Sequence, residues 1–224
     1  MGPVAGISLA VLDMAGTTVR DDGAVERAFR SALLAAGTPI GSELDRALEH
    51  ARATMGQSKI EVFRAIFAEE AQAQTANQAF ESAYDDTIAS SGAEPLPGAE
   101  DALRELRARG VRVCLTTGFS APTQARLVAA LGWAELVDLT LAPSSSRRGR
   151  PYPDLVLEAV LALRIDDVHA VAVAGDTVSD LVAGTRAGAA IVAGVLTGAH
   201  GRAQLESAPH THILESVAEL PALC

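Results

Sequence analysis

The stretch ISLAVLDMAGTTV, residues 7–19, decides the fold class of this chain. The mostly apolar run Ile7–Leu12 predicts a buried strand, and Asp13 stands directly at its carboxyl end. From about Gly92 onward, further short apolar runs alternate with helical patterns. These runs predict strands at Val111–Thr116, Leu136–Leu141, Ala170–Ala174, Ala190–Val195 and Thr211–Leu214. Near-continuous apolar strands that alternate with helices predict an α/β fold, with a doubly wound parallel sheet covered on both faces.

The residues between the first strand and the rest of the predicted sheet read only as helices. Apolar side chains recur at helical spacing from Val25 to Leu33 and at Phe80, Tyr84 and Ile88. A further helix is expected from Ser42 to about Arg52, and Ser58 to Glu61 has the Ser-x-x-Glu form of a capping box. The sequence therefore predicts a Rossmann-like core of residues 1–19 and 93–224, with an inserted all-helical cap at residues 20–92.

Composition limits the classes of partner. The 224 residues carry a formal net charge of −10, and such an acidic surface repels nucleic acid and anionic membranes. No apolar run approaches the roughly 20 residues that a membrane helix needs. The N-terminus lacks the basic region of a signal peptide, and the two cysteines, Cys114 and Cys224, make no disulfide framework. We therefore expect a cytoplasmic protein that acts on a small molecule.

Four polar clusters follow predicted strands, where ligands bind in open parallel sheets. They are DMAGTT (residues 13–18), TTG (116–118), SSSRRGRPYP (144–153) and GDTVSD (175–180). Each cluster alone is more typical of a turn, a cap or a solvated loop. Together they offer a nucleophilic carboxylate, a hydroxyl, a guanidinium and a second pair of carboxylates. Phosphoryl chemistry needs these groups, with Mg²⁺ held by the carboxylates.

In this order the four clusters resemble motifs I to IV of the haloacid dehalogenase superfamily. The resemblance implies a Mg²⁺-dependent hydrolase in which Asp13 attacks phosphorus. It implies that Asp13, Asp176 and the backbone carbonyl of Ala15 hold Mg²⁺, with support from Asp180. It also implies that Thr117 and Arg150 bind the phosphoryl oxygens. The residues expected to line the substrate site are Ala15, Gly16, Thr17, Met55, Gly118 and Phe119.

Ala15 and Lys59 refine this hypothesis. In the superfamily's ordinary phosphatases the residue two after the nucleophile is an aspartate that acts as general acid, whereas Ala15 has no proton to give. Cleavage of a carbon–phosphorus bond fits this absence, because a lysine imine can delocalise the charge on a carbon leaving group. Lys59 is the single lysine among 18 basic residues, and it lies in the predicted cap. A first helical turn and closure of the cap would both lower its pKa.

The segments DMAGTTV, MGQSKIEVFRA, LTTGF, GRPYP and GDTVSD resemble the phosphonoacetaldehyde hydrolase (phosphonatase) subfamily. That subfamily's imine lysine matches Lys59, its alanine matches Ala15, and a methionine matches Met55. The chain departs from the subfamily at Val62, where the subfamily has histidine, and at Phe119, where it has tyrosine. It also has no counterpart of a cysteine expected near Ala24. These departures leave the phosphorus chemistry intact and the exact substrate open.

Two alternatives stay open at this point. The first keeps the fold but makes the chain a phosphatase or phosphomutase for a small phosphate ester, with Lys59 only binding the substrate. The second is a binding protein on a retired hydrolase scaffold, which a fold alone does not exclude. None of the five histidines neighbours a cluster in sequence, so we expect no zinc site. The phosphonatase resemblance further implies a homodimer that contacts through the cap.

Overall fold

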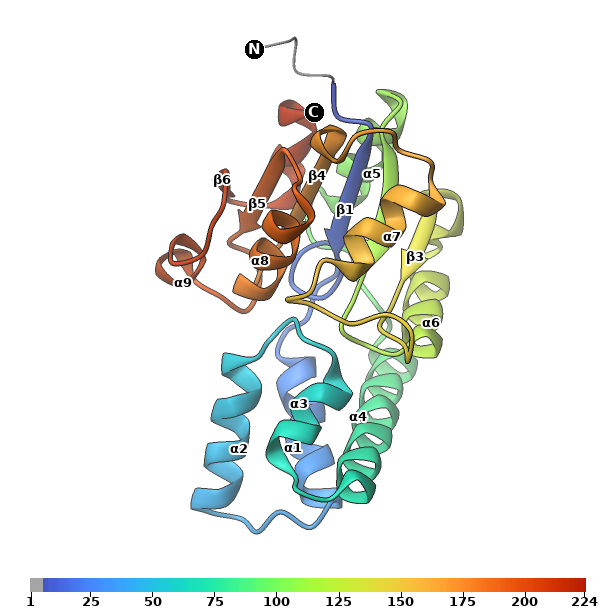
Figure 1. Cartoon of the computed structure of the whole chain (residues 1–224). Helices are drawn as coiled ribbons and strands as arrows, with labels where there is room; N and C mark the ends of the chain where they lie inside the picture. The colour runs from blue at the N-terminus through green and yellow to red at the C-terminus, as the bar shows by residue number, and fades with distance from the viewer. Residues whose placement is uncertain (1–5) are drawn as a thin grey trace.

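The computed structural model describes residues 6–224. Its central element is a six-stranded sheet in the order β3-β2-β1-β4-β5-β6, in which every neighbouring pair is parallel (Figure 1). The strands are β1 (Leu9–Asp13), β2 (Arg112–Thr116), β3 (Leu139–Leu141), β4 (Val171–Gly175), β5 (Ile191–Val195) and β6 (His212–Leu214). The parallel sheet predicted from the sequence is confirmed. The first five residues, where the N-terminal part of the predicted core begins, lie outside the described range.

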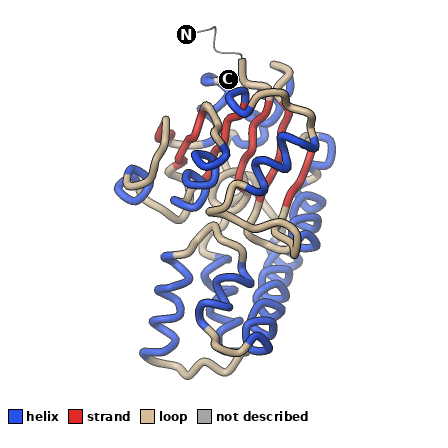
Figure 2. The backbone as a smooth tube through the Cα atoms, viewed as in Figure 1, coloured by secondary structure: helices blue, strands red, loops and turns tan. Residues whose placement is uncertain are grey.

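Helices cover the two faces of the sheet and also form a separate group below its carboxyl edge in Figure 2. The helices that pack on the sheet are α5 (Ala99–Ala108), α6 (Ala121–Leu131), α7 (Asp154–Ala162), α8 (Val178–Ala187) and α9 (Arg202–Glu206). The separate group consists of α1 (Ala24–Ala35), α2 (Ser42–Ala53), α3 (Lys59–Ile66) and α4 (Glu70–Ser91). Three short 3₁₀ helices span Trp133–Glu135, Val168–Ala170 and Val217–Leu223.

Alternation along β1 explains why the sheet is covered on both sides. Leu9 and Val11 pack with Leu155 of α7 on one face. Ala10 and Leu12 point to the other face, in the larger core cluster that includes α5 and the four separate helices. Because successive side chains of a strand point to opposite faces, an uninterrupted apolar strand requires cover on both.

Two local predictions need correction, at the third strand and at Ser58. The third strand begins at Leu139 rather than at Leu136, because the N–H of Leu136 closes a 3₁₀ turn by donating to the carbonyl of Trp133 (2.9 Å). The helix after β4 begins at Val178, and Thr177 and Asp180 form its capping box. No capping box forms at Ser58, whose side chain makes no cap hydrogen bond; the backbone N–H of Lys59 donates instead to the carbonyl of Gly118, 3.1 Å away.

Aromatic side chains form the centre of the four-helix group. The rings of Phe29 from α1, Phe63 from α3 and Phe80 from α4 lie with centroids 4.8–6.2 Å apart. All three are fully buried. Ring pairs at these separations stabilise a core beyond the contribution of their buried area. The group therefore has an apolar centre of its own, in addition to its contacts with the sheet.

Two chain segments connect this helical group to the sheet and run side by side. The N–H of Arg20 donates to the carbonyl of Glu94 (2.9 Å), and the N–H of Leu96 donates to the carbonyl of Thr18 (3.0 Å). Cys114 and Cys224 are both free. Within residues 6–224, no helix has both the length and the apolar character that crossing a lipid bilayer demands.

Candidate active site

The register of the sheet brings the polar clusters together at its carboxyl edge. Asp13, the last residue of β1, pairs with Thr116 on β2, and Leu12 pairs with Ala174 on β4, just before Gly175 and Asp176. One carboxylate oxygen from each of Asp13, Asp176 and Asp180 lies within 4.8 Å of the others. All three side chains are buried. Residues separated by more than 160 positions in sequence thus form one carboxylate cluster.

Short polar contacts orient the Asp176 side chain within the cluster. The hydroxyl of Thr17 donates to Asp176 Oδ1 (3.1 Å), and the N–H of Ala199 donates to Asp176 Oδ2 (2.6 Å). A Cβ at Gly16 would lie 2.6 Å from Asp176 Oδ2, and a Cβ at Gly198 would overlap the same carboxylate. Only glycine allows the backbone to approach Asp176 on both sides. The two glycines and the two donors therefore fix where the carboxylate points.

Arg150 is the positive charge inside this cluster. Its Nη1 contacts Asp13 Oδ1 at 2.6 Å and also pairs with Asp180. Burial raises the pKa of Asp13 to about 6, with a further increase from Asp180 and an opposing effect of Arg150. Burial, together with the charge of Asp13, also raises the pKa of Asp176 well above its ordinary value. Three buried carboxylates with one guanidinium leave an excess of negative charge that favours a bound cation.

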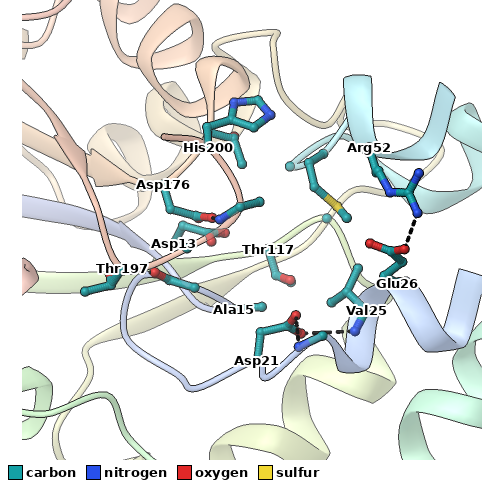
Figure 3. Close-up of a pocket in the computed structure, with 18 of the residues that line it drawn as sticks. Asp13, Ala15, Asp21, Val25, Glu26, Arg52, Thr117, Asp176, Thr197 and His200 are labelled. Atoms are coloured by element: carbon teal, nitrogen blue, oxygen red, sulfur yellow. Dashed lines mark hydrogen bonds and ion pairs between the residues drawn. The ribbon is translucent and has the colours of Figure 1, made fainter. Parts of the chain in front are cut away.

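A cavity of about 850 Å³ opens from this cluster and lies between the sheet and the helical group (Figure 3). It contains most of the residues predicted from the sequence. Its walls include Asp13, Ala15, Gly16, Met55, Lys59, Thr117, Gly118, Phe119, Arg150 and Asp176. Thr17 and Asp180 do not line the cavity and lie behind it, where Thr17 contacts Asp176 and Asp180 contacts Arg150.

Lys59 reaches the cavity from the first turn of α3. Its side chain is 5% exposed, and Nζ lies over the rings of Phe29 and Phe119 (both 5.3 Å) and Phe80 (5.7 Å). Among residues 6–224, no hydrogen-bond or ion-pair partner contacts Nζ. Burial, with a contribution from Arg150, lowers the pKa of Lys59 to about 8. The amine is therefore available within the same cavity as Asp13.

The loop before α3 holds the helical group against the sheet. Ser179 donates its hydroxyl hydrogen to the carbonyl of Met55 (3.0 Å), on the loop that ends at Lys59. Gly56 has a φ of +83°, and a Cβ there would overlap Thr177 Oγ1. A Cβ at Gly118 would likewise overlap the carbonyl of Gln57. The two parts of the chain approach so closely here that only glycine fits at these contacts.

Gly56→Ala is expected to lower kcat/KM on the order of 10²-fold, because the added methyl group pushes the Met55–Lys59 loop away from Thr177 and misplaces Lys59. Gly37→Ala is the matched control. Gly37 has a similar φ of +88° but no atom within 4 Å of its Cβ position, so it adds backbone strain without a clash. Steady-state kinetics of the two variants would measure the difference, and equal activities would rule out this role of the contact.

Sequence reasoning missed several cavity residues. Asp21 lies in the linker before α1, and Glu26 of α1 and Arg52 of α2 form an ion pair on the side of the cavity formed by the helical group (Figure 3). His200 is buried beside the carboxylate cluster, where its backbone N–H donates to the backbone carbonyl of Asp176 (3.3 Å). None of these residues follows a predicted strand within a motif. Their position depends on how the linker, the helices and the loop after β5 fold over the sheet, and a linear pattern does not contain that information.

The fold and the carboxylate cluster define the class of protein. A family model described as haloacid dehalogenase-like hydrolase matches residues 7–188. The chain belongs to this family of hydrolases, and the superfamily resemblance seen in the four motifs is confirmed.

Comparison with individual proteins shows which members of the family the chain resembles. The chain is 30% identical to a phosphonoacetaldehyde hydrolase of Pseudomonas aeruginosa, in an alignment that covers 97% of this chain and 91% of that protein. Its fold is similar to that of a phosphonoacetaldehyde hydrolase-like protein from Oleispira antarctica, with a TM-score of 0.83, 22% identity and coverage of 98% and 92%. It is also similar to that of a putative phosphoglycolate phosphatase from Lactobacillus delbrueckii, with a TM-score of 0.79, 18% identity and coverage of 98% of both chains.

Proposed function

We propose that this hydrolase cleaves the carbon–phosphorus bond of phosphonoacetaldehyde or of a related phosphonate, through an imine formed by Lys59. The observation that carries the proposal is the position of the Lys59 amine. It is buried, has a lowered pKa, and lines the same cavity as the nucleophilic carboxylate of Asp13. The similarity to a phosphonoacetaldehyde hydrolase over nearly the whole chain supports this substrate class.

The carboxylate cluster suits Mg²⁺. Its donor set consists of oxygens, which this hard cation prefers, and the oxygens are close enough together to share one ion. Asp13, Asp176 and the carbonyl of Ala15 would hold the ion, with Asp180 in support. When bound, Mg²⁺ would neutralise charge on the phosphoryl group during displacement.

The chain's own side chains would carry the remaining steps. The neutral Lys59 amine adds to the substrate's carbonyl group, and water leaves as the imine forms. The imine nitrogen takes a proton from solvent and becomes an iminium. An Asp13 oxygen then attacks phosphorus, while the electron pair of the carbon–phosphorus bond moves into the iminium and gives a neutral enamine. Thr117 and Arg150 line the cavity beside Asp13 and would bind the phosphoryl oxygens. Water finally hydrolyses the aspartyl-phosphate.

We propose that the helices act as a cap domain spanning residues 20–92 on a core of residues 1–19 and 93–224. In the structure, the loop before α3 packs on Gly118 and Ser179, which belong to the sheet part of the chain. Closure of this kind excludes bulk water from the reacting groups and brings Lys59 to the substrate. Opening of the cap would then admit the substrate and release the product.

Borohydride trapping tests the imine. Incubation with phosphonoacetaldehyde and borohydride is expected to inactivate the enzyme and to attach the reduced two-carbon unit to Lys59, detected by peptide mass spectrometry. The pKa of Lys59 is lowered to about 8, so the nucleophilic neutral amine becomes the major form above that pH. The labelling rate should therefore rise as the pH increases through about 8 and then level off. Absence of label on Lys59 would reject the imine.

The second candidate function is hydrolysis or phosphoryl transfer on a small phosphate ester, with Lys59 as a binding cation. The fold similarity to a putative phosphoglycolate phosphatase motivates it, although at 18% identity that similarity concerns the fold alone. A panel of phosphate esters distinguishes the two functions. Turnover of an ester that exceeds turnover of phosphonoacetaldehyde, without borohydride trapping, would favour this second function.

A further inference from the structure

Asp21 is a carboxylate of the cavity wall that the proposed reaction has not yet used. It lies in the linker between β1 and α1 and lines the same cavity as Asp13, Ala15 and Lys59. Its Oδ2 accepts from the N–H of Gly23 and its Oδ1 accepts from the N–H of Val25, both at 3.1 Å. Figure 3 shows these bonds, with the carboxylate pointing into the cavity. Asp21 is therefore held in a fixed orientation.

The proposed reaction needs a group that supplies a proton to the leaving atom. Ala15 stands where ordinary phosphatases of this superfamily carry an acid, and an alanine has no proton to give. Val62 and Phe119 are buried and apolar, so they transfer no proton near Lys59. Asp13 and Asp176 belong to the carboxylate cluster around Arg150. The proton must come from another side chain or from solvent.

The other carboxyl groups of the cavity fit this role less well. Glu26 is paired with Arg52, which lowers the pKa of Glu26 and keeps it ionised. Glu49 and Asp22 are exposed at the rim. Asp21 is half-buried, and its burial raises its pKa. Unlike Glu26, it has no ion-pair partner among residues 6–224, and unlike Glu49 and Asp22 it is shielded from bulk solvent. Among these four carboxyl groups, Asp21 is therefore the one best placed to exchange a proton with a substrate inside the cavity.

Charges on two helices act on Asp21. Lys59 of α3 and Arg27 of α1 favour its ionised form, and the two backbone N–H groups favour it as well. Tyr84 of α4 is neutral, because burial and the charge of Asp21 raise its pKa. The interaction with Lys59 couples the two groups: when the Lys59 charge is consumed as the iminium becomes an enamine, Asp21 loses a stabilising partner for its anion.

We infer that Asp21 is the acid–base residue that protonates the leaving group, in place of the acid missing at Ala15. This inference rests on the proposed function. As the carbon–phosphorus bond breaks, its electron pair forms the enamine and phosphorus bonds to Asp13. The Asp21 carboxyl then gives its proton to the enamine carbon, which becomes a C–H bond and restores the iminium. The Asp21 carboxylate takes a proton back from the water that adds to the iminium carbon, and the carbonyl product and the Lys59 amine are released.

Asp21→Asn separates this role from the two hydrogen bonds that the Asp21 carboxylate accepts. The single carbonyl oxygen of asparagine keeps one of the bonds to the N–H groups of Gly23 and Val25, so the melting temperature should fall by only about 2–4 °C. The variant cannot donate an acidic proton, and kcat/KM for phosphonoacetaldehyde is expected to fall by about 10²- to 10⁴-fold. Borohydride labelling of Lys59 should persist, because the imine still forms. Asp22→Asn is the matched control, since the neighbouring carboxylate is exposed.

A second substrate distinguishes proton transfer from a purely structural role of Asp21, because structural damage would lower the activity on both substrates. The leaving group of 4-nitrophenyl phosphate departs without a proton, so Asp21→Asn should retain most of the wild-type activity on it. An equal loss on both substrates, no loss on either, or the same loss in Asp22→Asn would overturn the inference. If the wild type shows no trapping and no phosphonoacetaldehyde turnover, the proposed function itself fails. The comparison is then made between an alkyl phosphate and 4-nitrophenyl phosphate, and it supports or rejects Asp21 by the same selective loss.

Discussion

Asp13→Asn is expected to lower phosphate release by at least about 10⁴-fold, in the presence or absence of added Mg²⁺, because an amide cannot attack phosphorus. The reason is structural as well as chemical. Asp13 ends β1 with its Oδ1 2.6 Å from Arg150 Nη1, which places it beside the guanidinium expected to bind the phosphoryl group. A phosphate-release assay with phosphonoacetaldehyde measures the effect.

The same substitution should not unfold the protein, and this provides its control. Burial raises the pKa of Asp13 from 3.8 to about 6, so its ionisation in the folded state costs stability. Protonated Asp13 favours the folded state. Its contribution to the free energy of unfolding is fully present below the unfolded-state pKa of 3.8 and is lost as the pH rises through about 6. At neutral pH without divalent metal, Asp13→Asn should therefore have a Tm equal to or above that of the wild type. Wild-type activity in a folded Asp13→Asn protein would contradict the role of Asp13 as nucleophile.

Lys59→Arg is expected to reduce turnover of phosphonoacetaldehyde on the order of 10³-fold or more, because a guanidinium keeps the positive charge but does not form an imine. Turnover of 4-nitrophenyl phosphate should change much less, since Asp13, Thr117 and Arg150 remain in place. Steady-state kinetics on the two substrates give the ratio directly.

Lys59→Met provides a matched control for the size of the side chain. Methionine is similar in length to lysine, and the surroundings of Nζ are the rings of Phe29, Phe80 and Phe119, so an apolar side chain should be accommodated without loss of stability. The imine hypothesis predicts that Lys59→Met and Lys59→Arg fail alike on phosphonoacetaldehyde. If Lys59→Arg retains activity while Lys59→Met does not, Lys59 acts by its charge alone, as in the phosphate-ester function.

The sheet and the motif residues could be predicted from the sequence because both depend on local pattern. An apolar run such as Leu9–Leu12 is buried wherever it folds, and Asp13 must then stand at the edge where the parallel strands end. Asp13, Thr117 and Asp176 lie in one cavity for this reason.

The part of the site formed by helices α1–α4 was harder to predict from the sequence. Ser58 and Glu61 have the spacing of a capping box, but the N–H of Lys59 bonds to Gly118 on the sheet side, and Glu61 pairs with Arg64. The contribution of Asp21 depends on the angle at which the linker enters α1. At Lys59 and at Asp21, contacts between segments far apart in sequence determine the local structure. Residue spacing along the chain does not predict such contacts.

Trapping of the phosphorylated enzyme is the most direct test of the central claim that Asp13 attacks phosphorus. The enzyme would be mixed with Mg²⁺ and phosphonoacetaldehyde, quenched in acid within one turnover, and digested for peptide mass spectrometry. We expect the peptide that contains Asp13 to carry the mass of one phosphoryl group, and this mass to be lost on treatment with hydroxylamine. Rapid phosphate formation with an unmodified Asp13 peptide, or a phosphoryl group on any other residue, would contradict the account.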